Sequence, residues 1–188
     1  MLLFQAYDRH LEQLTEVARR ACQALDGAGI PYRIVGGLAV FFHVHARDPL
    51  LARLTRDVDL AVNRADLSRI AETAKPLGLE YRHVAGVDML VDVTGSEARS
   101  AVHFVFAGEK VRSNYLEAVP QFSPTARNEG GFLLAPVSDL VKMKLTSFRL
   151  KDKTHLKDLD EAGLITPEIE AGLSEPLRER LKEVRASE

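Results

Sequence analysis

The sequence predicts an α+β fold, a mixed α/β architecture in which a twisted sheet of about five strands is flanked by helices. Helical and strand-like patterns alternate over residues 4–74, an order typical of folds in which helices pack on a sheet. Three strand-like runs then follow one another across short turns, which favours a meander. After residue 136 the patterns are helical, so we expect a C-terminal helical segment packed on the sheet.

The composition fits one domain and excludes several classes of protein. At 188 residues the chain can bury a sizeable core, which we expect over 1–135, with the helical segment over 136–188 in the same structural domain. Cys22 is the only cysteine, so we expect a buried thiol in a reducing compartment rather than a disulfide scaffold. The 25 basic and 27 acidic residues create no global field that requires nucleic acid. Without a secretory or membrane-spanning stretch, the sequence predicts a cytoplasmic protein with no membrane partner.

The first elements are predicted by apolar periodicity and by the residues that end them. The first helix repeats apolar residues every three or four positions and stops at 26–29, where glycine can adopt a left-handed cap. Pro31 then directs the chain into an extended run. In chain order we expect a helix over 4–25, a strand over 32–35, a helix over 38–45, a strand over 57–62 and a helix over 66–74.

The later elements are separated by turn residues and helix caps. Ala85-Gly86 separates two strand-like runs, and Gly163 caps a helix. We expect strands over 79–84, 87–93 and 102–106, a weaker strand over 132–135, helices over 137–150 and 153–162, and two more helices that begin at Thr166-Pro167 and Glu175-Pro176.

Two aspartates lie two positions apart on the strand predicted over 57–62. Because side chains alternate along a strand, Thr55, Asp57 and Asp59 project from one face. The two carboxylates then lie roughly 6 to 7 Å apart and repel each other in a partly dry cleft. Mg²⁺ relieves such repulsion, because it takes a few carboxylate oxygens and completes its shell with water and phosphates. The alternative interpretation is a solvated strand edge that carries two acids.

A glycine pair lies where the first strand leads into a helix. Gly36 and Gly37 have no side chains, so backbone N–H groups at the start of the helix can approach phosphate oxygens. By itself such a pair is also typical of a tight turn. Combined with the aspartates, and with Arg53 and Thr55 ahead of them, it predicts a site for a metal-bound nucleoside triphosphate.

These two motifs together resemble a known family signature. Gly36-Gly37-x-Ala39, followed by Arg53-x-Thr55-x-Asp57-x-Asp59-Leu60, is similar to the pattern of the polymerase-beta-like nucleotidyltransferase superfamily. Within it, the pattern most resembles the minimal and AbiEii-like branch, which includes toxin components of toxin-antitoxin systems. The resemblance implies a nucleotidyltransferase-like sheet, nucleotide binding by Gly36, Gly37 and Thr55, and catalytic Asp57 and Asp59 as ligands of Mg²⁺ or Mn²⁺.

A second match lies after residue 142. Lys144-Leu145-x-x-x-Arg149-x-Lys151-Asp152-x-x-His155-x-x-Asp158-Leu159 is similar to the AbiEii-like pattern of a lysine, an arginine and a Lys-Asp pair before a short helix. The resemblance implies a catalytic Lys144 and a nucleotide-binding Arg149, since a mobile point charge and a planar fork of donors suit a triphosphate. On a straight helix the two diverge by about 140°, so joint action requires the helix to end near Arg149. Without the family, the stretch is a basic helix surface.

A third carboxylate comes from a neighbouring strand in this superfamily and accepts the proton of the attacking hydroxyl. The strand that looks equivalent carries His103 at the position of that aspartate. His103 is either a base with a suitable intrinsic pKa or a packed, hydrogen-bonded residue. Asp88 and Asp92 on the preceding strand are the alternative third acid, if the strand register places them near the aspartate pair.

The expected function is transfer of a nucleoside monophosphate from a nucleoside triphosphate to an acceptor hydroxyl, with Mg²⁺ at Asp57 and Asp59 and pyrophosphate leaving. The acceptor is a tRNA, a protein or a small molecule. The alternative is a catalytically degenerate relative that binds a nucleotide or acts as an interaction module in a toxin-antitoxin or defence pair, with a cognate antitoxin as partner. The third acid discriminates between the two functions.

Overall fold

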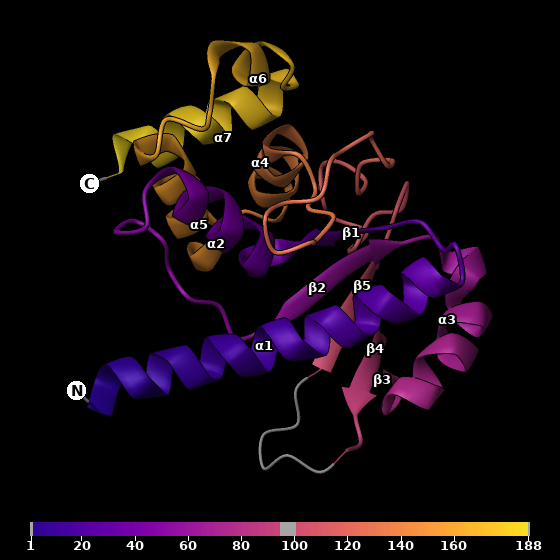
Figure 1. Cartoon of the computed structure of the whole chain (residues 1–188). Helices are drawn as coiled ribbons and strands as arrows, with labels where there is room; N and C mark the ends of the chain where they lie inside the picture. Colours follow the sequence, from indigo (N-terminus) through magenta and orange to yellow (C-terminus); the bar gives the residue numbers. More distant parts are fainter. Residues whose placement is uncertain (1, 95–100, 188) are drawn as a thin grey trace.

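A computed structural model describes residues 2–94 and 101–187, with side chains from residue 10 onward. Within these residues the chain forms a five-stranded mixed sheet flanked by helices, which confirms the predicted α+β fold (Figure 1). The strands are β1 (Tyr32–Val35), β2 (Val58–Val62), β3 (Leu79–Val84), β4 (Val87–Asp92) and β5 (Ala101–Phe106). The helices are α1 (Leu2–Gly27), α2 (Gly36–Arg47), α3 (Leu67–Ala74), α4 (Val137–Ser147), α5 (Leu150–Glu161), α6 (Pro167–Ala171) and α7 (Glu175–Ala186), with short 3-10 turns at Arg64–Asp66 and Lys75–Leu77.

The strand order β1-β2-β5-β4-β3 decides which residues lie beside the aspartates. β3, β4 and β5 are antiparallel neighbours and form the expected meander, whereas β2 and β5 run parallel. In this register Val35 of β1 lies opposite Asp59, and Asp59 lies opposite His103 of β5. Asp59 is therefore placed between the start of α2 and His103.

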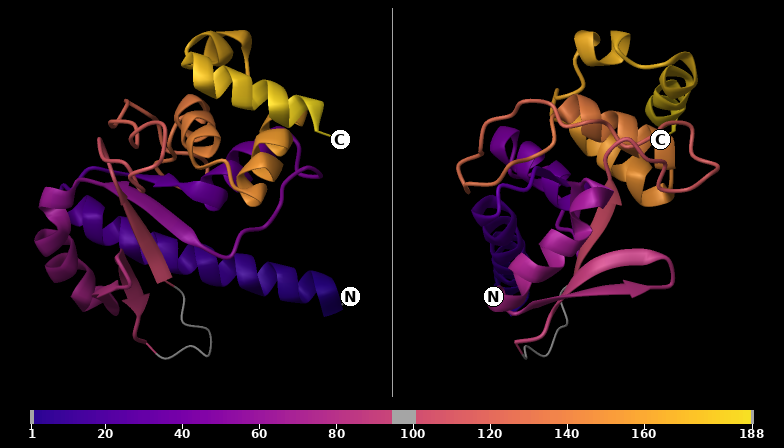
Figure 2. Two further views of the ribbon diagram at one scale, coloured as in Figure 1. Left: turned by 180° about the vertical axis from the view of Figure 1, so that it is seen from behind. Right: turned by 90° about the vertical axis from the view of Figure 1, so that its right-hand side faces the viewer.

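The two faces of the sheet have different neighbours. Arg20 of α1 binds Asp92 of β4, so α1 covers the face that Asp92 shares with Leu90. α3 packs beside α1 (Figures 1 and 2). His103 pairs with Met89, the neighbour of Leu90 on β4, and Asp59 pairs with His103, so Asp59 and His103 project from the other face. α4 and α5 pack on α2, and α7 packs on both of them.

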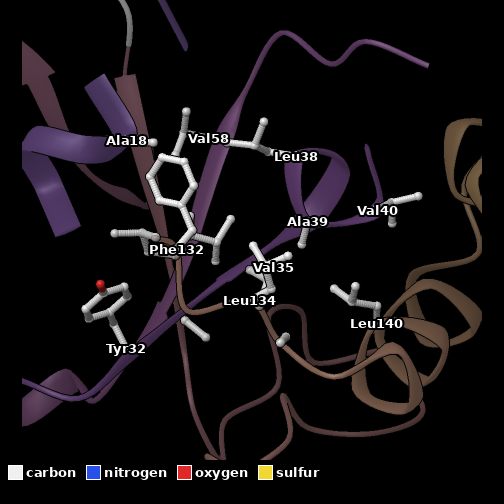
Figure 3. Close-up of a cluster of buried hydrophobic side chains, with 14 of the residues drawn as sticks. Ala18, Tyr32, Val35, Leu38, Ala39, Val40, Val58, Phe132, Leu134 and Leu140 are labelled. Atoms are coloured by element: carbon white, nitrogen blue, oxygen red, sulfur yellow. The ribbon is translucent and has the colours of Figure 1, made fainter. Parts of the chain in front are cut away.

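The buried core fixes α2 against the sheet. Figure 3 shows Val35 and Leu38 close to Val58 of β2 and Leu134 of the segment before α4, and all four side chains are buried. Burial of one such side chain contributes roughly 1.5 to 3 kcal/mol. The glycine pair at the start of α2 is therefore held at a defined place beside β2. Cys22 is buried in α1, as expected.

The weaker strand predicted over 132–135 is wrong. This segment forms two isolated bridges, a parallel one between Leu134 and Ile34 of β1 and an antiparallel one between Leu133 and Arg127. Backbone hydrogen bonds of 2.8 and 2.9 Å join Ile34 to Leu133 and Ala135. Pro136 follows and has no N–H group to continue a ladder, so the chain turns into α4 instead.

The predicted boundary between the helices over 137–150 and 153–162 is also wrong. α4 ends at Ser147, because Phe148 adopts a left-handed conformation with φ 51°, and α5 begins at Leu150. Phe148 fits the apolar period of α4, so the pattern gave no sign of a break. A phenylalanine is a rare residue in the left-handed region.

The ion pair between Arg20 and Asp92 makes stability depend on pH. Hydrogen bonds from Arg20 lower the pKa of Asp92 to about 2, and the Asp92 side chain is only 6% exposed. A lowered carboxyl pKa stabilises the folded state above the unfolded pKa of about 3.9, and this contribution is lost as the pH falls through 2. We expect Asp92→Asn to lower the free energy of unfolding by about 2.5 kcal/mol at pH 6 and by roughly half as much at pH 3.

Urea unfolding at the two pH values measures this difference. Glu80→Gln is the matched control, because Glu80 pairs with Arg82 on the exposed surface and such pairs contribute about 0 to 1 kcal/mol. A destabilisation by Asp92→Asn that is the same at pH 3 and pH 6 would contradict the role of this ion pair.

Candidate functional site

A cavity of about 940 Å³ opens beside the ends of β2 and β5. All seven site residues predicted from the sequence line it, although they come from the start of α2, the approach to β2, β2 itself, α4 and the residue before α5. They are Gly36, Gly37, Thr55, Asp57, Asp59, Lys144 and Arg149. Further lining residues are His103, Lys151 and His155 and, along the cavity, Arg64, His83, Asp88, Glu109, Arg112 and Tyr115.

Gly36 makes room for Asp59. Its φ of 70° lies in the left-handed region, and a Cβ atom placed on it would lie 2.0 Å from Oδ2 of Asp59. A Cβ atom on Gly37 would similarly lie 2.6 Å from Oγ1 of Thr55. The glycines are therefore needed for the close packing of α2 on Asp59 and Thr55, a reason that the sequence did not show. The same packing brings the free N–H groups of the first turn of α2 beside the carboxylates.

Asp57 and Asp59 form a like-charge pair in a partly dry environment. The Asp57 side chain is 45% exposed and the Asp59 side chain 30% exposed. Burial raises the pKa of Asp59 and the Asp57 charge adds to the rise, while Lys144 and His103 oppose it. Lys151 lies with Nζ 3.8 Å from Oδ2 of Asp57. A positive charge between the aspartates would therefore favour the ionised form of Asp59.

Asp152 is the centre of a buried polar network that holds Lys144 and Arg149. Lys144 Nζ donates a hydrogen bond to Oδ1 of Asp152 at 3.0 Å, and Arg149 Nε donates one to Oδ2 at 2.8 Å. The hydroxyl of Ser147 and the backbone N–H of Arg149 also donate to Asp152. Burial alone would raise the pKa of Asp152, but these donors and charges outweigh it and hold that pKa far below its usual range.

The network shows that the expected mobility of Lys144 is wrong, and that the helix ends near Arg149 as joint action of the two residues requires. Lys144 is only 5% exposed, so it is a fixed charge rather than the mobile one expected. The helix break at Phe148 makes Arg149 the N-cap residue of α5, and the condition that the helix ends near Arg149 is met. Lys144 and Arg149 converge on Asp152 from two different helices, with Arg149 49% exposed toward solvent.

The strand register excludes Asp88 and Asp92 as third acids beside Asp59. Met89 pairs with His103, so Met89 shares the face of His103 and Asp59, whereas Asp88 and Asp92 lie on the other face. Asp88 accepts hydrogen bonds from Tyr81 and His83 at 2.5 and 2.7 Å. Asp92 is held by Arg20 and Thr94.

His103 of β5 lies directly beside Asp59. Its Nδ1 lies 3.8 Å from Oδ1 of Asp59, and its side chain is 31% exposed. In the part of the chain that the structure describes, neither ring nitrogen makes a hydrogen bond. The two roles predicted for His103, a base and a packed residue, both stay predictions.

Two residues were not predicted as part of the site. Lys151 lies next to Asp57, and His155 packs with Cε1 3.3 Å from the position of a Cβ atom on Gly37. Burial and the Lys144 charge lower the pKa of His155 to about 4, so its ring is neutral near pH 7. Both residues were within the Lys144-to-Leu159 pattern, but periodicity alone could not show which side of α5 faces the cavity.

The divalent ion that the family resemblance implies fits the donors present. Among the described residues, no three His, Cys, Asp or Glu side chains are grouped so that they could hold a metal ion. Asp57 and Asp59 nevertheless repel each other at the wall of an open cavity. Mg²⁺ and Mn²⁺ bind such a pair of carboxylates and take water and phosphate oxygens as their further ligands. Asp57 and Asp59 are the residues that would hold it.

The Asp152 network leads to a stability prediction. Asp152→Asn would leave the buried Lys144 ammonium without its hydrogen-bonded countercharge, so we expect a loss of about 3 to 5 kcal/mol in the free energy of unfolding. Urea unfolding measures it, with Glu179→Gln as the control, since Glu179 forms an exposed pair with Lys182. Equal stability of the two variants would show that Asp152 does not hold the network.

Three solved structures are similar to this chain in fold. The crystal structure of ANT(2")-Ia in complex with adenylyl-2"-tobramycin is similar with a TM-score of 0.58 and 16% identity, covering 92% of this chain and 98% of that one. The solution structure of ANT(2'')-Ia gives a TM-score of 0.50 and 12% identity, covering 93% and 83%. An antigenic nucleotidyltransferase-like protein from Paracoccidioides brasiliensis gives 0.58 and 18%, covering 92% and 87%.

These likenesses confirm the nucleotidyltransferase-like fold that the sequence predicted. Comparisons with protein-family models and with curated proteins give no match. Among the described helices, none combines the length and the apolar character that a membrane crossing needs.

Proposed function

We propose that the chain is a nucleotidyltransferase that moves a nucleoside monophosphate from a nucleoside triphosphate to an acceptor hydroxyl. One observation carries the proposal: Asp57 and Asp59 share a single cavity with Lys144 and Arg149, which the Asp152 network fixes in place. Paired carboxylates and fixed cations are the two groups that a metal-bound triphosphate requires.

The residues of the chain position the triphosphate and neutralise its charge. The first N–H groups of α2 can donate to phosphate oxygens, because the glycines leave the helix start uncovered by side chains. Arg149 uses Nε and Nη2 to bind Asp152, which fixes its guanidinium while the side chain stays half exposed at the cavity. Lys151 adds an exposed positive charge beside Asp57. The arrangement suits a reaction that depends mainly on positioning and charge.

The ion held by Asp57 and Asp59 would supply Lewis acidity toward the phosphate and the attacking hydroxyl. In the proposed reaction a bond forms between the acceptor oxygen and the α-phosphorus. The bond from the α-phosphorus to the oxygen that bridges to the β-phosphate breaks. Pyrophosphate leaves, and the proton of the hydroxyl is released.

A labelling experiment tests the proposal and identifies the acceptor. Each of the four nucleoside triphosphates, labelled on the α-phosphate, is incubated with the protein, Mg²⁺ or Mn²⁺, and cell extract separated into RNA, protein and small-molecule fractions. We expect label in one fraction, with one pyrophosphate released for each nucleotide attached. Absence of both label transfer and pyrophosphate with all four triphosphates would contradict the proposal.

A second candidate function is nucleotide binding without transfer. It is favoured by one observation: no carboxylate lies directly beside Asp59 in the described sheet, where its two partners are Val35 of β1 and His103 of β5. A protein of this kind would bind a triphosphate in the same cavity and release no pyrophosphate in the labelling experiment. The tRNA, protein or small-molecule acceptor, membership of the AbiEii-like branch and a cognate antitoxin remain predictions from the sequence.

A further inference from the structure

We infer that His103 supplies a nitrogen ligand to the ion held by Asp57 and Asp59, so that the site selects a first-row transition ion such as Mn²⁺ over Mg²⁺. The inference rests on the proposed function, because it assumes an ion at the two aspartates. It goes further in assigning the third donor and the preferred metal. The donor set would be two carboxylates and one imidazole.

The register of β2 and β5 places two of these donors, Asp59 and His103, side by side. The three described side chains do not form a ready-made metal site, so side-chain movement would bring Asp57 and His103 onto the ion. The parallel register sets His103 directly beside Asp59, with both side chains on the same sheet face. The 3.8 Å between Nδ1 of His103 and Oδ1 of Asp59 is too long for a hydrogen bond. It is short enough for one ion to bind both atoms, because two ligands that each lie roughly 2.1 Å from an ion are at most about 4 Å apart.

His103 is also available for a ligand. Within the described residues, its ring nitrogens have no hydrogen-bond partner that a metal would have to displace, and 31% of the side chain is exposed at the cavity. The other candidates for a third donor are engaged elsewhere. Asp88 is held by Tyr81 and His83, and Asp92 is held by Arg20, both on the opposite face of the sheet.

The chemistry of the donors decides the metal. Mg²⁺ prefers oxygen ligands and releases its water reluctantly. Imidazole nitrogen binds transition ions better, and affinity for a given nitrogen and oxygen site rises from Mn²⁺ along the first row. A site with one imidazole therefore gains more for Mn²⁺ than for Mg²⁺, whereas a site with three carboxylates would not distinguish them in this way.

Electron spin-echo spectroscopy of bound Mn²⁺ tests the inference without any turnover. The full chain is loaded with Mn²⁺ alone, and coupling of the ion to ¹⁴N is recorded for the wild type and for His103→Ala. We expect ¹⁴N coupling in the wild type and its loss in His103→Ala. A wild-type spectrum without ¹⁴N coupling, or coupling that persists in His103→Ala, would overturn the assignment.

Competition between ions gives a second readout. The Mn²⁺ affinity relative to Mg²⁺ is measured from the signal of free Mn²⁺, and we expect His103→Asp to reduce this preference by at least about tenfold. His103→Gln serves as a second variant if His103→Asp fails to fold, and an unchanged preference would contradict the inference. The double variant Asp57→Asn/Asp59→Asn separates the two failures. If the double variant no longer binds Mn²⁺ but the wild type shows no ¹⁴N coupling, only the inference about His103 fails. If the double variant binds Mn²⁺ as well as the wild type does, the proposed site at Asp57 and Asp59 is itself contradicted.

Discussion

Replacement of Asp57 and Asp59 by asparagine is expected to lower nucleotide transfer by roughly 10³-fold or more. The two carboxylates are the negative charges that would hold the ion, and an amide supplies oxygen without charge. Because the Asp59 pKa is raised by burial and by Asp57, removal of both charges relieves repulsion, so the variant should fold at least as well as the wild type. Release of pyrophosphate from a triphosphate labelled on the γ-phosphate measures the rate.

Glu72→Gln is the matched control, because it makes the same chemical change on the exposed surface of α3 away from the cavity. Circular dichroism and urea unfolding verify that each variant is folded. If the aspartate variant and the control transfer nucleotides equally fast, the assignment of Asp57 and Asp59 as ion-binding residues is wrong.

Gly36→Ala is expected both to destabilise the protein and to remove triphosphate binding. The new methyl group would meet the Asp59 carboxylate at 2.0 Å, and the residue would be held at a φ of 70°. The left-handed conformation costs about 1 to 2 kcal/mol for alanine, and overpacking typically adds about 1 to 3 kcal/mol. We expect the free energy of unfolding to fall by about 3 to 4 kcal/mol, measured by urea unfolding.

Gly29→Ala separates the two causes. Gly29 has a similar φ of 63°, but a Cβ atom there would have no neighbour within 4 Å. This variant should therefore show the backbone cost alone, about 1 to 2 kcal/mol, and leave triphosphate binding unchanged. Equal losses of stability in the two variants would mean that the contact between Gly36 and Asp59 is unimportant.

Much of the fold could be predicted because short stretches of sequence determine where most helices and strands begin and end. The apolar period of α1, the turn at Ala85-Gly86 and the break at Gly36 are each visible within a few residues. The apolar residues over 132–135 fit a strand, but the segment forms only isolated bridges, one from Leu134 to Ile34 and one from Leu133 to Arg127. The left-handed Phe148 could not be predicted, because the residue suits the helical period that it interrupts.

The sequence predicted which residues line the cavity, but not which of them contact one another. The spacing of Asp57 and Asp59 pointed to an ion site, yet the residue beside Asp59 depends on how β2 pairs with β5, a contact between distant parts of the chain. That register places His103, and not Asp88, beside Asp59. Similarly, nothing in the helical pattern around Lys144 indicates that its ammonium group is buried and bound to Asp152.

The central claim is that the cavity at Asp57 and Asp59 binds a metal-bound triphosphate. Calorimetric titration with a nucleoside triphosphate analogue whose α,β-bridge is a methylene group measures this binding apart from transfer. We predict that the wild type binds the analogue only when Mg²⁺ or Mn²⁺ is present, and that Asp57→Asn/Asp59→Asn abolishes the ion-dependent part while Glu72→Gln retains it. Equal binding with and without the ion, or undiminished ion-dependent binding by the aspartate variant, would contradict the claim.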